Sequence, residues 1–479
     1  MRLFICLLLL GLPSVYLPFE NNPLFVSDVK WVYSLIFFLP LIFGLCRICR
    51  TVLIPWSGKE IFFLVFLLCA VLSSCLVNYR AVTVYKFVLF LPVFASFYCG
   101  KYIRLHNWDR MFRYMAVSGV LAAVILTFFS RGIDISSKTA MIHSVASFAN
   151  RSNFAGALFV CLTLIAGFIF YEKSLVRKSL FLGLFIILSM ILFQLFLRTY
   201  WVLYCLMILM MMRIYAKQAD NRRILVGFSL AAVVSCVSVV LLFFESITKR
   251  FMTIFTLEHV SIAKRLLLWM CAKDIIAVHP FWGAGMGQFE YVHSKYLLEN
   301  WESLRRVLPI TVFQNGLSEA VAVNVHNDIL EFACDFGAAA ALSLLLFVCF
   351  TLYGCFLRRA GSPSGKGIMI IGVVCLCMCL AGLLHSTAHH PVTAVYFFMS
   401  LGILQNESRF STKTRSEDGH SLYAILSAAV FLFSAHFGIR GVMGNYYFER
   451  AGSIPSDNPS LKKTYYRLAA HYKPIEYRI

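Results

Sequence analysis

A histidine, an asparagine and three carboxylates are grouped in one short segment, at His326, Asn327, Asp328, Glu331 and Asp335. The segment stands between the longest non-apolar run of the chain and an apolar run that is long enough to cross a bilayer. Asp328 and Glu331 have the spacing of a capping box, which predicts a helix that starts near Asn327 or Asp328. A neutral imidazole can take a proton from an attacking hydroxyl, so His326 is a candidate general base. The alternative is a polar helix start that only anchors a membrane span.

Two arginines add a second chemical function. Arg198 lies between two apolar runs with almost no loop around it, and such an arginine is costly unless it reaches water or an anion. The alternative is a snorkelling side chain that marks the end of a span. A guanidinium keeps its charge and grips phosphate oxygens bidentately. Arg198, Arg265 and His326 together therefore suit chemistry on a phosphorylated lipid, in which the arginines neutralise a departing pyrophosphate.

Three further histidines, His385, His389 and His390, stand at the end of an apolar run. Such a group can indicate a metal site. However, clustered histidines at a span end are more often interfacial, and no carboxylate or cysteine lies at ligand spacing beside them. We therefore predict neither a metal site nor a cofactor.

The composition predicts an all-α polytopic membrane protein. Hydrophobic residues make up 60% of the 479 residues, only 14% are charged, and the mean hydropathy is +0.77. The net charge of +20 comes from short basic clusters between apolar runs, which is how orientation signals are distributed, so we do not expect a nucleic-acid partner. The cysteines fall mostly inside apolar runs and are interpreted as small core residues.

Apolar runs predict about 12–13 transmembrane helices. The first is interpreted as a retained span and not as a cleaved signal peptide, because no clear small-residue cleavage site follows it. The expected spans are 2–18, 31–46, 60–77, 83–99, 112–129, 153–171, 179–197, 199–212, 224–244, 327–357, 367–386, 391–405 and 421–439.

Basic loops alternate with less basic ones along the whole chain, which places the N-terminus in the cytoplasm. Four regions are expected: N-terminal transmembrane helices (1–244), a large extracytoplasmic loop with short helices (245–325), C-terminal transmembrane helices (326–439) and an extracytoplasmic helical tail (440–479). Arg198, Arg265 and His326 then face the outside, where no nucleotide-sugar is supplied, so an activated donor there must be carried by a lipid.

The predicted extracytoplasmic loop contains a helix over 261–277, which Ser261 can cap. Its expected apolar stripe consists of Ile262, Leu266, Trp269 and Met270. A His-Pro pair ends this helix, and FWGAGMGQF follows. Its alternating glycines are not interpreted as a nucleotide site, because no strand precedes them; they predict a tight turn that folds the loop back onto the membrane domain.

Four segments together resemble the O-antigen ligase superfamily, which also contains O-antigen polymerases and bacterial protein O-oligosaccharyltransferases. FANRSN resembles the family's Asn-rich span start, and LRTYW resembles its Ser/Thr-Arg-x-x-Trp segment, with Leu197 in place of the small hydroxyl residue. The stretch RLLLWMCAKDIIAVHPFWGAGMGQF is similar to its Arg-x-x-x-Trp helix and the following glycine motif, and HNDILEFACDFG is similar to its His-Asn-x-x-Leu-Glu segment.

The resemblance implies an inverting, metal-independent transfer of a glycan from undecaprenyl diphosphate to a hydroxyl. It implies His326 as the base and diphosphate contacts at Arg198 and Arg265. Supporting roles are expected for Asn327, Glu331, Trp269, Asn150 and Asn153.

The first choice among functions is an O-antigen ligase of the bacterial cytoplasmic membrane, with a lipid A–core acceptor and a periplasmic active site. A polymerase that extends the carrier-linked glycan is second, and a protein O-oligosaccharyltransferase is third. The rival class is a transporter of lipid-linked glycan. That class needs charges spread along a path through the membrane, whereas these residues gather at one rim, and no inverted repeat stands out.

Overall fold

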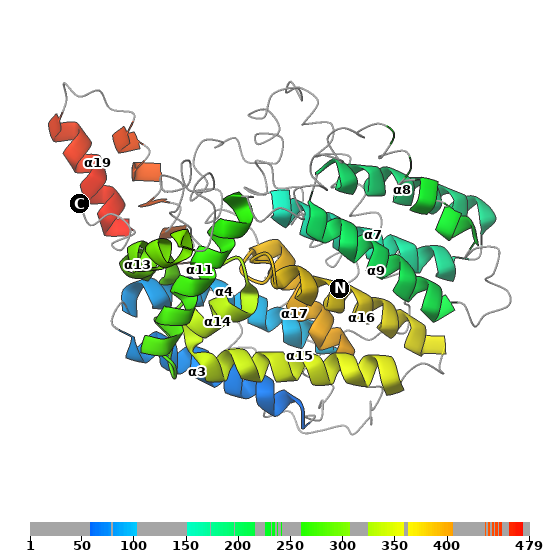
Figure 1. The fold of residues 1–479 in the computed structure, drawn as a ribbon, viewed down its shortest axis with the longest axis horizontal. Coiled ribbons are helices and arrows are strands. Elements are labelled where there is room, and N and C mark those ends of the chain that lie inside the picture. The colour runs from blue at the N-terminus through cyan, green and yellow to red at the C-terminus, as the bar shows by residue number, and fades with distance from the viewer. Residues whose placement is uncertain are drawn as a thin grey trace.

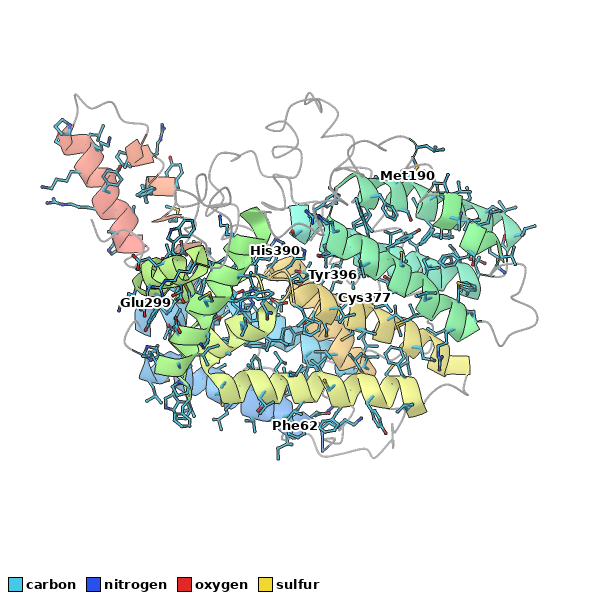
Figure 2. The ribbon with its side chains drawn as sticks, viewed as in Figure 1. Phe62, Met190, Glu299, Cys377, His390 and Tyr396 are labelled. Carbon is cyan, nitrogen blue, oxygen red and sulfur yellow. The ribbon has the colours of Figure 1, made fainter. Side chains whose placement is uncertain are left out.

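The protein, in this computed structural model, is all-helical over the residues that the structure describes. These are 58–77, 80–102, 151–172, 174–195, 197–215, 260–306, 324–358, 363–405 and 459–472, with parts of 226–241 and 436–452. Most of the long helices lie side by side in a bundle, and α11 runs across one end of it (Figure 1). Side chains fill the bundle interior (Figure 2).

The helices of the bundle are α3 (Glu60–Leu76), α4 (Arg80–Tyr102), α7 (Arg151–Tyr171), α8 (Leu175–Gln194), α9 (Arg198–Tyr215), α15 (Ala338–Arg358), α16 (Pro363–Gly382) and α17 (Pro391–Gln405). The helices at or beyond the end of the bundle are α11 (Val260–Val278), α12 (Phe289–Val292), α13 (Ser294–Arg305), α14 (Asp328–Phe336) and α19 (Pro459–Tyr472).

Two of the described helical stretches, Leu175–Phe193 and Ala338–Leu357, are long and apolar enough to cross a membrane. Large apolar side chains are exposed on their outer faces, for example Leu180 at 68% and Leu342 at 56%. Side chains of this kind are suited to contact lipid. The helices expected near 60–77, 83–99, 153–171, 179–197, 199–212, 367–386 and 391–405 are present. The spans expected at 2–18, 31–46 and 112–129 lie outside the described residues, as do most of 224–244 and 421–439.

The prediction of one continuous span over 327–357 was wrong, because the chain breaks at Gly337. There α14 ends and α15 begins, with Gly337 at φ 91°. Ala338 donates its N–H to the carbonyl of Pro280 at 2.8 Å, so the segment that contains Pro280 packs against the junction of α14 and α15. A side chain at Gly337 would collide with the backbone of Phe281, and its positive φ would be strained for other residues. The break makes α14 a separate short helix at the end of the bundle.

Aromatic packing fixes α14 on the bundle. Phe66 of α3 lies edge-on to Phe332 and to Phe336, with ring centroids 5.5 and 5.8 Å apart. Phe66 also contacts Phe94 of α4 at 5.5 Å, and all these rings are almost fully buried. Edge-to-face rings add specific geometry to the area that they bury. This helix therefore rests on the core, although it lies at the end of the bundle.

The helix predicted over 261–277 is confirmed as α11, with two corrections. It already begins at Val260, so Ser261 lies inside the helix and does not cap it. Its buried face is not the predicted stripe, because Leu266, Trp269 and Met270 are only half-buried. The buried residues with helical spacing are Leu268, Cys271, Ala272 and Ile275. Together with Phe289 and Val325 they form a small second core that joins α11 to the start of α14.

The prediction of a tight turn after α11 is confirmed. Residues 281–288, called here the glycine turn, fold back onto the C-terminal end of α14. Ala284 and Gly285 donate their N–H groups to the carbonyls of Cys334 and Asp335 at 2.7 and 3.1 Å. Gly283 has φ 68°, and a side chain there would meet the same carbonyl groups. The turn therefore holds α11 and α14 in a fixed relation.

One lysine from the short basic clusters between apolar runs has a structural partner. Lys101, near the end of α4, lies 2.6 Å from Glu60 at the start of α3, and both side chains are almost fully buried. A buried and hydrogen-bonded ion pair fixes geometry because either charge would be costly alone.

Candidate functional site

His326 stands immediately before α14 in an unusual backbone conformation. Its φ is 58°, in the left-handed region that residues with a side chain seldom adopt. Asn327 caps the helix, and its Oδ1 accepts the N–H groups of Ile329 and Leu330 at 3.1 Å each. The amide Nδ2 of Asn327 donates to the carbonyl of Leu383 at 3.1 Å. The three hydrogen bonds of the Asn327 side chain therefore define the direction in which the chain enters α14.

The predicted capping box is corrected by this arrangement. The cap is Asn327, and the side chains of Asp328 and Glu331 point inward and are almost fully buried. Ser386 donates its hydroxyl to Glu331 Oε2 at 2.9 Å, and the N–H of Ala388 donates to Asp328 Oδ2 at the same distance. Residues 383–390, called here the 383–390 segment, connect α16 to α17. They thus supply hydrogen-bond donors to the carboxylates of α14.

The surroundings of His326 keep its imidazole neutral. Burial, followed by the positive charges of Arg265 and Lys264, lowers the pKa of His326 to about 4. At neutral pH the ring therefore carries one N–H and one free lone pair, which is the form that can accept a proton. The sequence did not single out Lys264, although it neighbours Arg265.

The two predicted arginines and His326 lie within electrostatic reach of one another. Arg198 is the first residue of α9, and Arg265 lies in the second turn of α11. Burial and the charge of Arg198 lower the pKa of Arg265. Two like charges held near each other in a partly buried place create a site that favours an anion. We call Arg198, Lys264 and Arg265 the cationic group.

His385 lies near Arg265 and His326, a position that the sequence did not predict. It is 6% exposed, its Nε2 lies 3.3 Å from Thr199 Oγ1, and its ring stacks on that of Tyr200 with centroids 5.8 Å apart. Burial, and then the charges of Arg265 and His326, lower the pKa of His385 to about 3. Tyr200 in turn donates its hydroxyl to the carbonyl of Ser152, which joins the start of α9 to that of α7. Position at a span end was the only sequence signal for His385.

The other residues predicted to support the site are Trp269, Asn150 and Asn153. Trp269 lies four positions after Arg265 on α11 and is half-buried, and its indole N–H is buried without a hydrogen-bond acceptor in the described part of the chain. Asn153 lies in the first turn of α7, near the junction that Tyr200 makes. Asn150 lies outside the described residues. The supporting roles of these three residues stay predictions.

His389 and three carboxylates of α14 form a buried group, called here the carboxylate cluster. His389 Nδ1 lies 3.3 Å from Asp328 Oδ1 and 3.9 Å from Glu331 Oε2, and its Nε2 lies 3.3 Å from Asp335 Oδ2. Carboxylates are therefore absent beside these histidines in the sequence, but the fold brings three of them to His389. The three acids are one helical turn or two apart, so they share one face of α14, and the fold brings His389 to that face.

The titratable groups of the carboxylate cluster have shifted pKa values. Burial raises the pKa of Glu331 to about 8, against the opposing charge of His389. Burial also raises the pKa values of Asp328 and Asp335, although hydrogen bonds from His389 oppose this. Burial alone would lower the pKa of His389, but the carboxylates raise it well above its usual value. At neutral pH we therefore interpret His389 as a cation and Glu331 as a neutral acid.

Three of these residues are close enough together to hold a metal ion. Ligand atoms of Asp328, Glu331 and His389 lie within 4.8 Å of one another, as a metal ion would require. However, both ring nitrogens of His389 already face carboxylate oxygens, and the N–H of Gly287 donates to Asp335 Oδ1 at 3.1 Å. Metal binding would need one of these nitrogens to be released. We therefore interpret the cluster as an ion-pair network.

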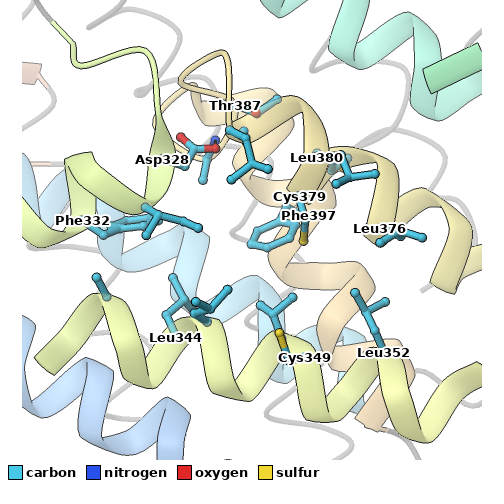
Figure 3. A pocket seen from close by; sticks show the side chains of 18 residues that line it. Asp328, Phe332, Leu344, Cys349, Leu352, Leu376, Cys379, Leu380, Thr387 and Phe397 are labelled. Carbon is cyan, nitrogen blue, oxygen red and sulfur yellow. Dashed lines mark hydrogen bonds between the residues drawn. The ribbon is translucent and has the colours of Figure 1, made fainter. Parts of the chain in front are cut away.

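An apolar cavity of about 240 Å³ begins beside the cluster (Figure 3). Asp328 and Thr387 lie at its polar end, and Phe332 and Phe397 project into the same space (Figure 3). It continues between α15 and α16 along residues such as Leu344, Leu345, Val348, Leu352, Leu376 and Leu380. The cavity thus connects the start of α14 with the apolar interior of the bundle.

Comparison with known proteins agrees with the motif resemblance. Residues 182–345 match the model of a protein family described as O-antigen ligase. The matched stretch contains Arg198, Arg265 and His326, whereas His385 and His389 lie beyond it. No curated protein matches the chain.

Proposed function

We propose, from the match of residues 182–345 to the family model described as O-antigen ligase, that this membrane protein transfers a glycan from undecaprenyl diphosphate to a hydroxyl acceptor. As the acceptor we propose the lipid A–core of lipopolysaccharide, which makes the protein an O-antigen ligase. The observation that carries the proposal is the cationic group beside a neutral histidine at the start of α14.

Binding of the donor is assigned to two neighbouring features. Arg198 and Arg265 bind the diphosphate, because guanidinium forks match phosphate oxygens and remain charged. The apolar cavity between α15 and α16 is suited to the first part of a polyprenyl chain, since its lining is almost entirely apolar. Its polar end lies at the start of α14, so tail and diphosphate can be bound together.

The reaction requires a base that accepts the proton of the acceptor hydroxyl, and cations that stabilise the negative charge of the leaving diphosphate. His326 takes the proton from the acceptor hydroxyl, whose oxygen attacks the anomeric carbon of the donor glycan. The bond from that carbon to the diphosphate oxygen breaks, and its electron pair leaves with the diphosphate. Attack from the face opposite the leaving group inverts the anomeric centre. Arg198 and Arg265 stabilise the charge that develops on the leaving group.

The site is proposed to face the periplasm. The alternation of basic and less basic loops supports a cytoplasmic position for the N-terminus and the opposite end of the bundle. With this topology a finished, carrier-linked glycan reaches the site from the lipid phase. No nucleotide-sugar is needed.

The glycan that accumulates on the carrier after deletion of the gene tests this function. If the protein is a ligase, we expect long, finished chains to remain on the carrier while the lipid A–core stays unmodified. Single repeat units on the carrier would instead identify a polymerase. Finished chains together with normal lipopolysaccharide and unmodified glycoproteins would identify a protein glycosyltransferase. Carrier-linked glycan retained on the cytoplasmic side, with no glycan transferred to any outer acceptor, would identify a transporter.

A further inference from the structure

The imidazole of His389 is within hydrogen-bond distance of two acids that lie two helical turns apart on α14. His389 Nδ1 faces Asp328 at 3.3 Å, and its Nε2 faces Asp335 at the same distance. A neutral ring has a single N–H and could donate to only one of them, whereas a doubly protonated ring donates to both. The His389 side chain is 8% exposed, so water contributes little to its solvation. The geometry therefore favours a buried cation at this position.

The other oxygens of the carboxylate cluster bind two further segments. They accept hydrogen bonds from the N–H of Gly287 in the glycine turn at 3.1 Å, from the N–H of Ala388 at 2.9 Å and from the hydroxyl of Ser386 at 2.9 Å. α14 is thus joined on one side to the end of α11 through the glycine turn. On the other side it is joined to the 383–390 segment.

The 383–390 segment reaches the proposed catalytic residues through their neighbours in the chain. Its His385 lies 3.3 Å from the hydroxyl of Thr199, and its Leu383 carbonyl accepts the amide of Asn327 at 3.1 Å. Thr199 follows Arg198, and Asn327 follows His326. The segment therefore bridges the element that carries an arginine and the element that carries the histidine.

We infer that His389 is a positioning residue of the transfer site, a cation bonded at both ring nitrogens that holds the 383–390 segment on α14 and so sets His326 relative to Arg198. His389 touches neither of these two residues. It acts through Asp328 and Asp335, and through the segment in which it lies. The consequences for catalysis rest on the proposed glycan transfer, whereas the doubly bonded cation can be observed independently.

The charged groups that face His389 determine what its loss would do. They are the three carboxylates of α14, and the stem of Lys86 from α4 lies next to Gly287 of the glycine turn, which bonds to one of them. The rings of Phe332 and Phe90 complete its surroundings, with centroids 4.5 and 6.0 Å from the imidazole. Removing the cation leaves buried carboxylates without compensation, so they must take up protons or move apart.

The first test compares His389→Gln with the same exchange at an exposed histidine, His436→Gln. Both proteins are purified in detergent, checked for monodispersity and thermal unfolding, and assayed with polyprenyl-diphosphate-linked glycan. Because His389 does not contact the donor, we expect kcat of His389→Gln to fall about 10- to 100-fold while the donor KM stays within about threefold. His436→Gln should match the wild type in both. An unchanged kcat in folded His389→Gln would overturn the inference.

A second variant keeps the test decisive if His389→Gln does not fold. The double variant with Asp335→Asn removes one acid together with the cation, and we expect it to fold with the same loss of kcat. Recovery of wild-type kcat in the double variant would reject a positioning role for the cation.

The protonation state is tested by nitrogen NMR of protein labelled in its histidines. We expect one imidazolium signal, with both nitrogens protonated, to persist at pH 8 in the wild type and in His436→Gln and to vanish in folded His389→Gln or in the double variant. Absence of that signal in the wild type contradicts the inference even if transfer is active. A stoichiometric divalent metal that is present in the wild type and lost in His389→Gln would also contradict it. If the wild type transfers no glycan but shows the signal, the proposed function fails and the buried cation stands.

Discussion

His326 combines two properties that are costly in a protein and useful in a catalyst. Its backbone is held in the left-handed region, and its imidazole is half-buried beside cations that keep it neutral. Strained backbone of this kind persists only where the surrounding structure determines it, as the Asn327 cap does here. A base that is neutral at the working pH is ready to accept a proton.

Replacement of His326 by asparagine tests its role without disturbing the backbone. Asparagine tolerates a positive φ better than alanine does, so His326→Asn should fold and insert normally. We expect its turnover to fall about 10²- to 10⁴-fold, because the proton acceptor is lost. The measurement is glycan transfer by the purified variant at matched folded protein. Transfer at the wild-type rate would remove His326 from the mechanism.

Arg198 can be tested by a substitution that keeps its charge. A lysine offers a point charge and not a planar fork, so Arg198→Lys should lower kcat/KM for the diphosphate-linked donor by about 10- to 100-fold. The matched control is Arg213→Lys, an exposed arginine in the last turn of the same helix. Near-wild-type transfer by Arg198→Lys would refute the proposed diphosphate contact.

At this scale the sequence indicated the main candidates but not their partners. Arg198 and His326 could be chosen because a charged or titratable residue beside an apolar run is unusual, and Arg265 because it stands on the same predicted side and in the Arg-x-x-x-Trp motif. Nothing in the spacing of His385 and His389 connects them with Thr199 or with the acids of α14, because those contacts depend on how α16 and α17 pack. Contacts of this kind are set by tertiary structure, which a local pattern does not contain.

At the scale of the element, α14 organises the site. Its first residue follows the candidate base, one face carries the carboxylate cluster, and Phe332 and Phe336 anchor it to α3. The sequence predicted a helix start here and a span after it, and both are present. It did not predict the break between them, because Gly337 stands in an otherwise continuous apolar run and its conformation is set by contact with Pro280 and Phe281.

The protonated state of Glu331 predicts how stability depends on pH. The folded protein keeps this proton up to about pH 8, whereas the unfolded chain releases it near the ordinary value of 4.5. Between these values the folded state binds more protons, so stability falls as pH rises, and this contribution is lost above about pH 8. Glutamine resembles the neutral acid at every pH. Glu331→Gln should therefore gain unfolding temperature relative to the wild type as pH rises from 6 to 9.

Thermal unfolding in detergent across this pH range provides the measurement. The control is Glu299→Gln, which changes an exposed acid on α13 in the same way. A constant difference between Glu331→Gln and the wild type at all pH values would show that Glu331 is ionised in the folded protein.

At the scale of the whole molecule, the chemistry is gathered at one end of an apolar bundle. α11, α13 and α14 lie at the end where α15 begins, and the other helices extend away from it (Figure 1). Composition predicted this class of protein because lipid-facing helices need apolar side chains all round. The division into regions at 244, 325 and 439 stays a prediction, since much of the chain near these boundaries lies outside the described residues.

Cysteine labelling tests the proposed orientation. Ser294, exposed at the start of α13, and Arg213, exposed at the far end of α9, are changed to cysteine one at a time. In spheroplasts we expect an impermeant maleimide to label Ser294→Cys above the wild-type background, and Arg213→Cys only after the membrane is opened. The reverse pattern would invert the topology.

Transfer by the purified protein tests the proposed reaction without the rest of the cell. Undecaprenyl-diphosphate-linked glycan and lipid A–core are supplied in the presence of a chelator, and glycan-modified lipid A–core and released undecaprenyl diphosphate are measured together. We predict equal amounts of both products, an inverted linkage and no loss of rate with the chelator. Absence of transfer, or a rate that returns only when a divalent ion is added, would contradict the account.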